Sequence, residues 1–437
     1  MSGSGKIKIT ETMKKCKELL LNGDSQAIFL TGVAGTGKSV TLKYVEKCLT
    51  DAKRNIVKLA PTGIAALNVG GQTIHSFCKF GFNYRPLSAI KKNKELSGIV
   101  KKIDVVIVDE ISMVSAYLFD AMNRFFQVNS GNSDFFGGKS LLMIGDMFQL
   151  PPVIDTRKSS DMAALAGLGY DPNRMSFFNA KSINDCDNLQ TLELTEVFRQ
   201  KDAKFVSLLN KIRKGEFDGS DLSFINLCTK NKNIESDKNA IILCTTNAIA
   251  DEDNRVNLDK LKGATKTYTA SKTGTFAGIN LDSRLPAQSS LILKVGAKVM
   301  VVKNAFGCVN GDIGHVEKMT DDIITIIVNG RSFDIEKTKW EDVEYAIEEG
   351  EVASKSIGVF QQFPLRLGYA ITIHKSQGQT FNKVCIKMGY GAFAHGQTYV
   401  ALSRCVAIDN LYLEKEIRSK DVIVSSDVKS FYARIGS

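Results

Sequence analysis

Eight residues near the amino terminus have the types and spacing of a phosphate-binding loop. They run Gly32-Val33-Ala34-Gly35-Thr36-Gly37-Lys38-Ser39, after the apolar run 27–30 and before a helical pattern. Glycines let backbone N–H groups close around phosphate oxygens, and the N-terminus of the following helix adds a favourable dipole. The lysine of such a loop reaches the β- and γ-phosphates, and its serine hydroxyl binds Mg²⁺. The sequence therefore predicts that a nucleoside triphosphate binds at Gly32, Gly35, Thr36, Gly37, Lys38 and Ser39.

Two acidic residues follow a second apolar run. Asp109 and Glu110 come directly after 105–108, downstream of the loop. In a phosphate-loop fold, the strand beside the loop delivers an aspartate to the Mg²⁺ shell and places the next acid beside the attacking water. A strand that ends in two acids is a weak signal alone, but together with the loop it is strong. The pair predicts hydrolysis of the nucleotide, because a binding switch has less need of a base beside the metal.

Three further residues are candidates for contacts with the γ-phosphate. Gln149 lies in the segment Gly145–Val153, where a structural turn made by the two prolines is the alternative. Arg199 follows 194–198, and Arg404 ends the segment 397–404. A single arginine is usually part of a surface salt bridge, whereas one that reaches a γ-phosphate from another domain contributes about 10³–10⁵ in rate. These residues taken one by one leave both interpretations open.

Three segments carry polar side chains and backbone amides suited to contacts with a nucleotide or a phosphodiester chain. Two lie in the first half, at 61–63 and 73–77, and the third, 374–380, follows the apolar run 370–373. Threonine and histidine suit phosphate contacts, and phenylalanine offers a face on which a base can stack. Taken singly, His75 and His374 are more often structural histidines with satisfied hydrogen bonds.

The elements that must hold these residues divide the chain into three parts. Continuous apolar runs at 27–30, 56–60, 104–108 and 141–145 predict buried strands of a parallel sheet, and 116–127 has the spacing of a core helix. After residue 190, strands at 240–243, 384–387 and 411–413 and a helix at 397–404 predict a second α/β unit. Strands at 299–302, 323–328 and 332–335, the last two joined by an Asn329-Gly330 turn, predict an all-β insertion. The predicted fold class is α/β with an inserted β domain.

The amino-acid composition limits the classes of partner and compartment that the protein can have. The chain has 437 residues and a net charge of +10, which suits a polyanionic partner, although an ordinary solvated surface explains it about as well. The acidic run 341–351 is expected on a solvated face, and so is a lysine cluster at 91–102. The nine cysteines include no Cys-x-x-Cys pair, which argues against zinc or iron–sulfur sites and fits a reducing compartment. No apolar stretch approaches the roughly 20 residues of a membrane span, so a cytoplasmic location is expected.

The ordered series of motifs resembles the PIF (petite integration frequency) family of superfamily-one B DNA helicases. The resemblance extends from about Ala27 to Leu413, and its most family-specific segments are 145–153 and 374–380. Its motifs are 32–39, 60–66, 73–77, 109–113, 145–153, 194–200, 293–300, 369–380 and 397–404.

The resemblance implies two RecA-like P-loop motor domains with parallel sheets. The first would span 1–190, with a small wedge insertion at 62–74. The second would be formed by 191–250 together with 358–437. An SH3-like all-β domain would occupy 251–357.

The resemblance also implies the activity and its partners. Family members hydrolyse ATP with Mg²⁺, translocate 5′ to 3′ on single-stranded DNA and unwind forked duplexes, RNA–DNA hybrids and G-quadruplexes. Such helicases serve replication, recombination, repair or telomere-type maintenance. A monomer in solution is expected.

Residue roles follow by the same resemblance. Lys38 and Ser39 would bind phosphate and Mg²⁺, and Asp109 and Glu110 would hold the metal and activate water. The γ-phosphate would be sensed or stabilised by Gln149, Arg199, Gly378 and Arg404. The implied DNA contacts are Pro61, Thr62, His75, Phe77, Thr246, Asn247, His374, Ser376 and Thr380.

One departure from the family pattern concerns the base of the nucleotide. Segment 7–24 has no clear Leu-x-x-x-Gln ahead of the loop, the feature with which many relatives read adenine. The chain also ends soon after the last motif, which favours a bacterial or phage enzyme.

The alternatives to a DNA helicase are a RecD-like or RNA-directed translocase, and an ATP-dependent nucleic-acid-binding switch that does not unwind. The second α/β unit, with Arg199 and Arg404, argues against the switch.

Overall fold

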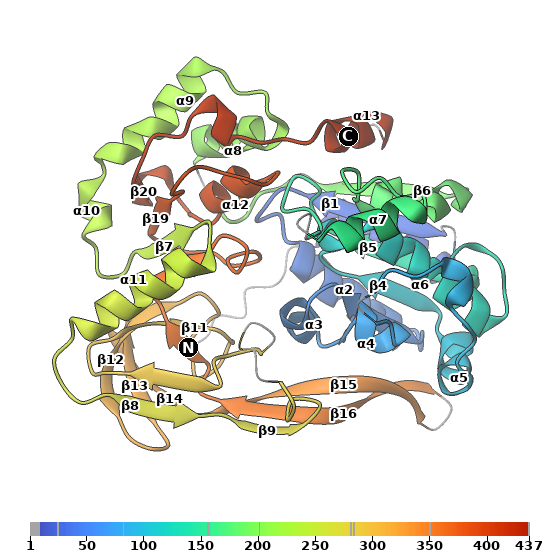
Figure 1. The fold of residues 1–437 in the computed structure, drawn as a ribbon, viewed down its shortest axis with the longest axis horizontal. Coiled ribbons are helices and arrows are strands. Elements are labelled where there is room, and N and C mark those ends of the chain that lie inside the picture. Colours follow the sequence, from blue (N-terminus) through green and yellow to red (C-terminus); the bar gives the residue numbers. More distant parts are fainter. Residues whose placement is uncertain are drawn as a thin grey trace.

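The computed structural model describes residues 9–23, 26–81, 83–154, 158–200, 202–279, 282, 285–348 and 351–435. Two α/β domains lie side by side, and a β domain lies beside them with a long hairpin that runs along the α/β domain of the N-terminal half (Figure 1). We call the α/β domain that contains the phosphate-binding loop the first domain and the other the second domain.

Six parallel strands form the sheet of the first domain, in the order β3-β2-β4-β5-β1-β6. Alternate residues of its strands face opposite sides: Ala27 and Phe29 belong to one hydrophobic cluster, and Ile28 and Leu30 to another. Because both faces are covered, these strands are continuous apolar runs. The strands are β1 (Ala27–Gly32), β2 (Ile56–Ala60), β3 (Gln72–Thr73), β4 (Val105–Val108), β5 (Ser140–Ile144) and β6 (Leu189–Leu194).

Helices cover both faces of this sheet. On one side α1 and α2 contribute Leu20 and Val45 to the core, and on the other α6 contributes Phe119. The last helix of the chain, α13 (Ser426–Ile435), packs on the α6 side, where Phe431 stacks on Phe178 with ring centroids 4.4 Å apart. The other helices are α1 (Glu11–Asn22), α2 (Lys38–Asp51), α3 (Gly63–Val69), α4 (Ile74–Cys78), α5 (Lys94–Lys102), α6 (Ala116–Ser130) and α7 (Ser159–Gly167).

The second domain has a parallel four-stranded sheet in the order β18-β7-β19-β20. Its core also takes in Ala34 and Leu150 of the first domain, so the two domains share a continuous apolar contact. The strands are β7 (Ile241–Cys244), β18 (Ala370–Thr372), β19 (Val384–Lys387) and β20 (Leu411–Leu413). The helices are α8 (Ala203–Lys214), α9 (Gly219–Asn226), α10 (Lys232–Glu235), α11 (Asn247–Asp259) and α12 (Gln397–Ser403).

The inserted β domain consists of three antiparallel groups of strands. Five strands form the order β14-β13-β12-β11-β17, three form β15-β16-β9, and β8 pairs with β10. Asn329 and Gly330 both have positive φ and form the β13–β14 turn, as predicted. The strands are β8 (Lys266–Thr269), β9 (Ser271–Gly274), β10 (Ser290–Leu293), β11 (Lys298–Val301), β12 (Ile313–Met319), β13 (Ile324–Val328), β14 (Arg331–Ile335), β15 (Thr338–Glu348), β16 (Glu351–Gln362) and β17 (Leu365–Leu367).

The boundaries expected from the sequence differ from these elements in three places. Strand β6 extends the first sheet to Leu194, past the division expected at 190. The limit expected at 357 falls inside β16, and β17 still belongs to the β domain. The last helix, α13, was expected in the second domain but packs on the first. A boundary drawn from local pattern cannot detect such a return of the chain, because the contact depends on tertiary packing.

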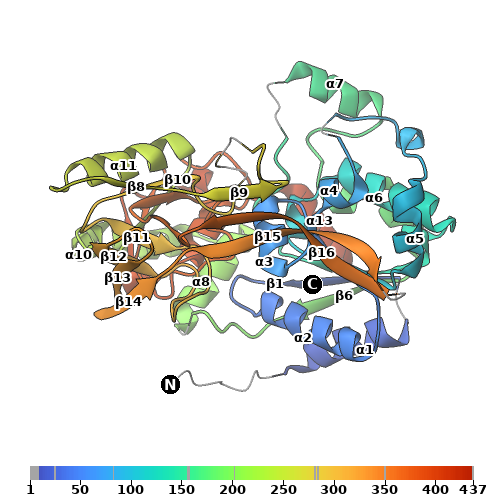
Figure 2. The ribbon, with the colours of Figure 1, turned by 90° about the horizontal axis from the view of Figure 1, so that it is seen from below.

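One further segment differs from its expected form. Residues 62–74, expected as a wedge insertion, form α3 and the edge strand β3 of the first sheet. The acidic run lies on the β15–β16 hairpin, which lies across the first domain beside α3 and α5 (Figure 2), and its Glu341, Glu348 and Glu351 are exposed, as expected. Its Tyr345 is buried against Phe77, and the Tyr345 hydroxyl accepts a hydrogen bond from the Lys58 N–H at 2.8 Å. One aromatic residue therefore attaches the hairpin to the first domain.

The predicted strands at 27–30, 56–60, 104–108 and 141–145 and the core helix at 116–127 are all present. All nine cysteines are free thiols. Among the helices within the described ranges, none has the length and apolarity to cross a lipid bilayer.

Candidate active site

A cleft of about 520 Å³ lies between the two domains, and we call it the interdomain cleft. It brings together most of the residues predicted to act on a nucleotide. It is lined by Gly35, Thr36, Gly37, Lys38, Ser39, Asp109, Glu110, Gln149, Arg199, Gly378 and Arg404, and by Thr380, which was expected at DNA. Gly32 lies behind the loop, where a Cβ atom would stand 2.6 Å from the Thr36 hydroxyl oxygen.

The phosphate-binding loop requires glycine at two positions that face the cleft. Gly35 and Gly37 both have φ of +87°, which L side chains rarely adopt. A Cβ on Gly35 would also stand 2.5 Å from that of Arg199. The Lys38 ammonium group donates to the carbonyl oxygens of Gly32 at 2.6 Å and Val33 at 3.1 Å, so it is held over its own loop. Burial lowers the pKa of Lys38, because it removes water from the charged ammonium group, and the charges of Asp146 and Glu110 oppose this shift.

The two acids stand at the end of β4, opposite the loop. Burial raises the pKa of Asp109, and burial together with the Asp109 charge raises the pKa of Glu110 to about 7. Glu110 has a φ of +51°, an uncommon conformation for a residue that is not glycine. Such local strain persists only where the surroundings fix it, and it is concentrated at functional sites. The backbone thus aims two carboxyl groups into the cleft.

Two arginines also line the cleft: Arg404 at the end of α12 in the second domain, and Arg199, whose backbone lies against Gly35 of the loop. Arg404 is 1% exposed, and its guanidinium donates to backbone carbonyls and to the Ser403 hydroxyl. Arg199 donates to the Ser403 carbonyl at 3.1 Å. Burial and the Arg404 charge lower the pKa of Arg199 to about 9. Within the described part of the chain, no carboxylate forms an ion pair with the buried Arg404 or the half-buried Arg199, so this pair of cations fits a polyanion.

Gln149 reaches the cleft from a tight turn after β5. Its N–H donates to the Asp146 carbonyl at 2.9 Å, and the Phe148 N–H donates to the Asp146 carboxylate at 3.2 Å. The Asp146 carboxylate therefore shapes the turn that presents Gln149. On the opposite rim, Thr10 and Met13 at the start of α1 line the cleft, in the segment where the adenine-reading glutamine was not found.

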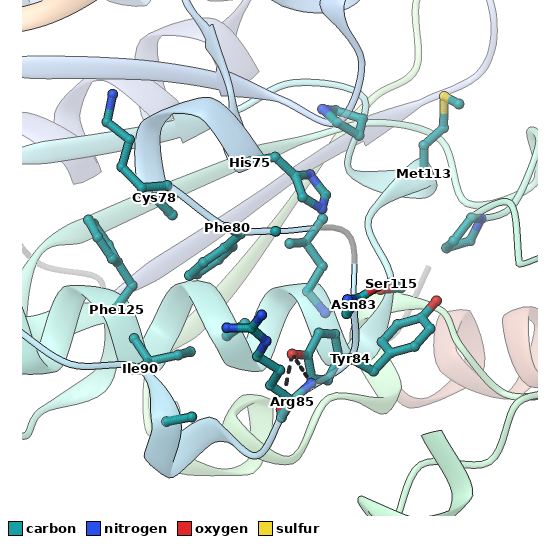
Figure 3. A pocket seen from close by; sticks show the side chains of 18 of the residues that line it. His75, Cys78, Phe80, Asn83, Tyr84, Arg85, Ile90, Met113, Ser115 and Phe125 are labelled. Atoms are coloured by element: carbon teal, nitrogen blue, oxygen red, sulfur yellow. Dashed lines mark hydrogen bonds between the residues drawn. The ribbon is translucent and has the colours of Figure 1, made fainter. Parts of the chain in front are cut away.

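A second cavity of about 520 Å³ lies within the first domain, and we call it the first-domain cavity. It contains the predicted DNA contacts Pro61, Thr62 and His75. Its walls carry the rings of Phe80 and Tyr84, with His75 and Met113 across from them and Arg85 beneath (Figure 3). The Tyr117 hydroxyl bonds the Arg85 backbone N–H at 2.9 Å and holds this loop in place.

At two of the predicted DNA contacts the side chain is buried, which argues against a direct side-chain contact. Phe77 is 1% exposed and packs against Phe125, Phe126 and Tyr345, so its ring cannot stack on a base. Ser376 is fully buried, and its hydroxyl donates to the Ile373 carbonyl at 2.8 Å.

The other predicted DNA contacts of the second domain lie at the ends of strands. Thr246 and Asn247 are exposed where α11 begins, and His374 is half-buried after β18. Thr62 and Thr246 occupy matching positions in the two domains: each follows a parallel strand, and its hydroxyl accepts from the third residue of the helix it caps.

Three residues at the interdomain contact were not singled out from the sequence. Asp146 and Arg213 form a buried ion pair at 2.9 Å, and the Tyr399 hydroxyl donates to Asp146 at 3.2 Å. Asp146 and Tyr399 lie inside the motif segments 145–153 and 397–404, and this position was a weak indication that they have a functional role. Arg213 lies on α8, where a basic residue in the last helical turn resembles an ordinary surface charge.

The comparisons with known proteins agree with this arrangement. The profile of a family described as PIF1-like helicase matches residues 8–222. The Campylobacter jejuni protein named ATP-dependent DNA helicase Pif1 is 30% identical, over 93% of this chain and 94% of its own length. The human ATP-dependent DNA helicase PIF1 is 32% identical, over 93% of this chain and 61% of its own length. The chain spans 61–65% of the length of the fungal (Emericella nidulans), rat and human relatives that it matches.

A solved structure supports the same relation. The crystal structure of Bacteroides sp. Pif1 in complex with ADP-AlF4 superposes with a TM-score of 0.87 at 32% identity, over 98% of this chain and 97% of that one. This match confirms the expected fold class of two RecA-like domains with parallel sheets. The chain belongs to the PIF1-like helicase family.

Proposed function

We propose that this protein is an ATP-dependent DNA helicase that moves 5′ to 3′ on single-stranded DNA and unwinds duplex DNA ahead of it. The observation that carries the proposal is the interdomain cleft. There a phosphate-binding loop and two acids meet the buried Arg404 and the half-buried Arg199, neither of which forms an ion pair with a carboxylate of the described residues. A cleft walled by two domains couples the state of the nucleotide to the distance between them.

ATP with Mg²⁺ is the ligand that the cleft fits best. Gly35 and Gly37 place no side chain of their own over the loop amides, and Arg199 and Arg404 supply positive charge at the same cleft. Ser39 and Asp109 would hold the metal, which supplies charge neutralisation at the phosphates when bound. Lys38 would bind the phosphates directly.

The roles of the remaining residues follow from position and charge. Glu110 would take a proton from the attacking water, and its raised pKa suits a general base near neutrality. Arg199 and Arg404 would stabilise negative charge that develops on the phosphates, which is worth about 10³–10⁵ in rate for such an arginine. Gln149 and Gly378 would contact the terminal phosphate from the two sides of the cleft.

The DNA track would run over the carboxyl ends of both parallel sheets. Thr62 and Thr246 are equivalent phosphate contacts, because each hydroxyl and helix N-terminus offers donors to an anion. Pro61, His75, Asn247 and His374 would complete the track. Two equivalent contacts, one on each domain, would approach and separate as the cleft closes and opens.

The wider function follows from the same family. We propose that forked duplexes, RNA–DNA hybrids and G-quadruplexes are substrates, in replication, recombination, repair or telomere-type maintenance. The division into a first motor domain, a second motor domain and an SH3-like β domain is part of the proposal. The protein would act as a monomer in the cytoplasm of a bacterial or phage-infected cell.

The test is strand separation driven by ATP on matched duplexes with a 5′ or a 3′ single-stranded DNA tail. Lys38→Ala serves as the inactive control. Unwinding from the 5′ tail alone supports both the motor and its direction. Unwinding from the 3′ tail would contradict the direction, and unwinding from RNA tails alone would indicate an RNA-directed motor. Hydrolysis without separation on any substrate would contradict the helicase.

A further inference from the structure

A network of buried polar groups crosses from the second domain to the phosphate-binding loop. Tyr399, on α12 of the second domain, is 3% exposed. Its hydroxyl accepts a hydrogen bond from the Ala34 N–H at 2.9 Å and donates to the Asp146 carboxylate at 3.2 Å. Ala34 belongs to the phosphate-binding loop, and Asp146 to the turn that presents Gln149. The Tyr399 hydroxyl of the second domain therefore contacts two segments of the first domain that line the cleft, the phosphate-binding loop and the Gln149 turn.

A second residue of the second domain fixes the same carboxylate. Arg213 on α8 donates to Asp146 through Nε at 3.1 Å and Nη2 at 2.9 Å, and both side chains are almost fully buried. The guanidinium also lies over the Phe148 ring, 4.4 Å from its centroid. We call Ala34, Asp146, Arg213 and Tyr399 the cross-domain relay.

The relay can be complete only while the two domains are in contact. Asp146 and the Ala34 N–H belong to the first domain, whereas the Tyr399 hydroxyl and the Arg213 guanidinium come from the second. If the domains separate, water must replace each of these partners. Burial of the Ala34 N–H and the Asp146 carboxylate is favourable only while Tyr399 and Arg213 are bonded to them. With these partners present, the two groups favour the closed arrangement of the domains.

We infer that Tyr399 is a positioning residue that locks the phosphate-binding loop and the Gln149 turn to the second domain, with Arg213 as its partner on Asp146. The inference rests on the proposed function and extends it to residues that do not line the cleft. Tyr399 and Arg213 would make the geometry of the loop depend on domain closure. The arginines of the second domain would then meet the phosphates only when the loop is correctly held.

The chain offers a matched control for Tyr399. Tyr432 on α13 also lies beside Asp146 and Phe148, with its ring stacked on Phe148 at 4.7 Å. Its hydroxyl bonds the Thr31 hydroxyl at 2.7 Å and accepts from the Met147 N–H at 3.4 Å. Because α13 packs on the first domain, this hydroxyl does not join the two domains. Tyr399→Phe and Tyr432→Phe each remove one buried hydroxyl and keep the ring.

The first measurement is amide hydrogen exchange of the full chain without nucleotide or DNA. In Tyr399→Phe, exchange within 32–39 should become faster by about tenfold, because a hydrogen bond to a buried amide is lost. In Tyr432→Phe, exchange in the same segment should stay within about twofold of the wild type. Equal exchange in the wild type and Tyr399→Phe would overturn the inference. Since no catalysis is needed, this result holds even if the proposed function fails.

The second measurement is ATP hydrolysis at saturating single-stranded DNA. In Tyr399→Phe, kcat should fall about five- to tenfold while the KM for ATP stays within about twofold, because Lys38 and Ser39 bind the phosphates from the first domain alone. Tyr432→Phe should leave both constants within about twofold. Equal losses of kcat in the two variants would reduce Tyr399 to a structural role and overturn the coupling. An inactive wild type would instead count against the proposed function.

Discussion

The interdomain cleft and the first-domain cavity have the same volume, about 520 Å³, but they are built in different ways. The cleft is walled by strand ends and the phosphate-binding loop, and its charged side chains are buried or half-buried. The first-domain cavity is bounded by the segment 79–93, which carries rings and exposed basic side chains such as Lys79 and Arg85. The comparison indicates that one site fixes a highly charged ligand by backbone geometry, and the other offers flat apolar faces with positive charge around them.

The largest expected effect concerns the buried charge of the cleft. Arg404→Ala should lower the rate of ATP hydrolysis by at least about 10³, because it removes a cation aimed at the phosphates. Affinity for single-stranded DNA should change by less than about twofold. The measurement is steady-state hydrolysis beside a DNA titration.

Controls separate this loss from a loss of folding. Arg404 also donates to the carbonyls of Val400, Ser376 and Gln379, so melting temperatures should be recorded for Arg404→Ala and for Arg404→Lys, which keeps a charge. Arg331→Ala, on the exposed strand β14, should leave hydrolysis unchanged. Near-normal turnover in Arg404→Ala would contradict the assignment.

The second prediction contrasts two phenylalanines beside the first-domain cavity. Phe77→Ala should lower the free energy of unfolding by about 3–5 kcal/mol, because its ring fills the core between α6 and Tyr345. Phe80 is half-buried, so Phe80→Ala should lower the free energy of unfolding less than Phe77→Ala does. It should lower the affinity for single-stranded DNA more. Urea unfolding and a single-stranded DNA titration measure the two effects.

A milder variant sharpens this contrast. Phe77→Leu keeps most of the core volume, and it should bind DNA as the wild type does. A large loss of affinity in folded Phe77→Leu would revive the original prediction that Phe77 stacks on a base. An equal loss of stability in Phe77→Ala and Phe80→Ala would show that the two rings are buried alike.

The contrast also explains which parts of the site the sequence predicts. Lys38, Asp109 and Glu110 are found by spacing because a strand end and a glycine loop position them locally. The same reasoning cannot identify Arg213, because its role depends on a tertiary contact between α8 and Asp146. Phe77 has a residue type suited to DNA, but its place on α4 turns it into the core, which a short helix without a clear period does not reveal. The return of α13 to the first domain is a tertiary contact that local pattern does not encode.

The third prediction tests the two equivalent threonines. Asp is as good a helix N-cap as Thr, so Thr62→Asp and Thr246→Asp should fold normally while a negative charge faces the DNA. Each should weaken binding of single-stranded DNA by about tenfold, and more at low salt, because phosphate contacts dominate affinity. Ser223→Asp, at an exposed position in the middle of α9, adds the same charge away from the track and should bind normally. An effect of only one of the two threonine variants would place the track on a single domain.

The smallest expected effect is a dependence of stability on pH. Burial lowers the pKa of all four histidines: His75, His315, His374 and His395. A lowered pKa means that the unfolded chain binds more protons than the folded one just below the ordinary value of about 6.5, so stability should fall as the pH drops through that value.

His395 is the histidine that should contribute most to this dependence. Its Nδ1 accepts from the Ser425 N–H at 3.0 Å, so Nε2 carries the proton and donates to the Met147 carbonyl at 2.8 Å. A second proton on Nδ1 would break the contact with Ser425 and release the segment that leads to α13. Urea unfolding at pH 7.5 and 5.8 should show a loss of about 1 kcal/mol in the wild type, and a smaller loss in His395→Gln. An identical loss of stability in both proteins would assign the pH dependence to the other three histidines. The contact between His395 and Ser425 would then be insensitive to pH.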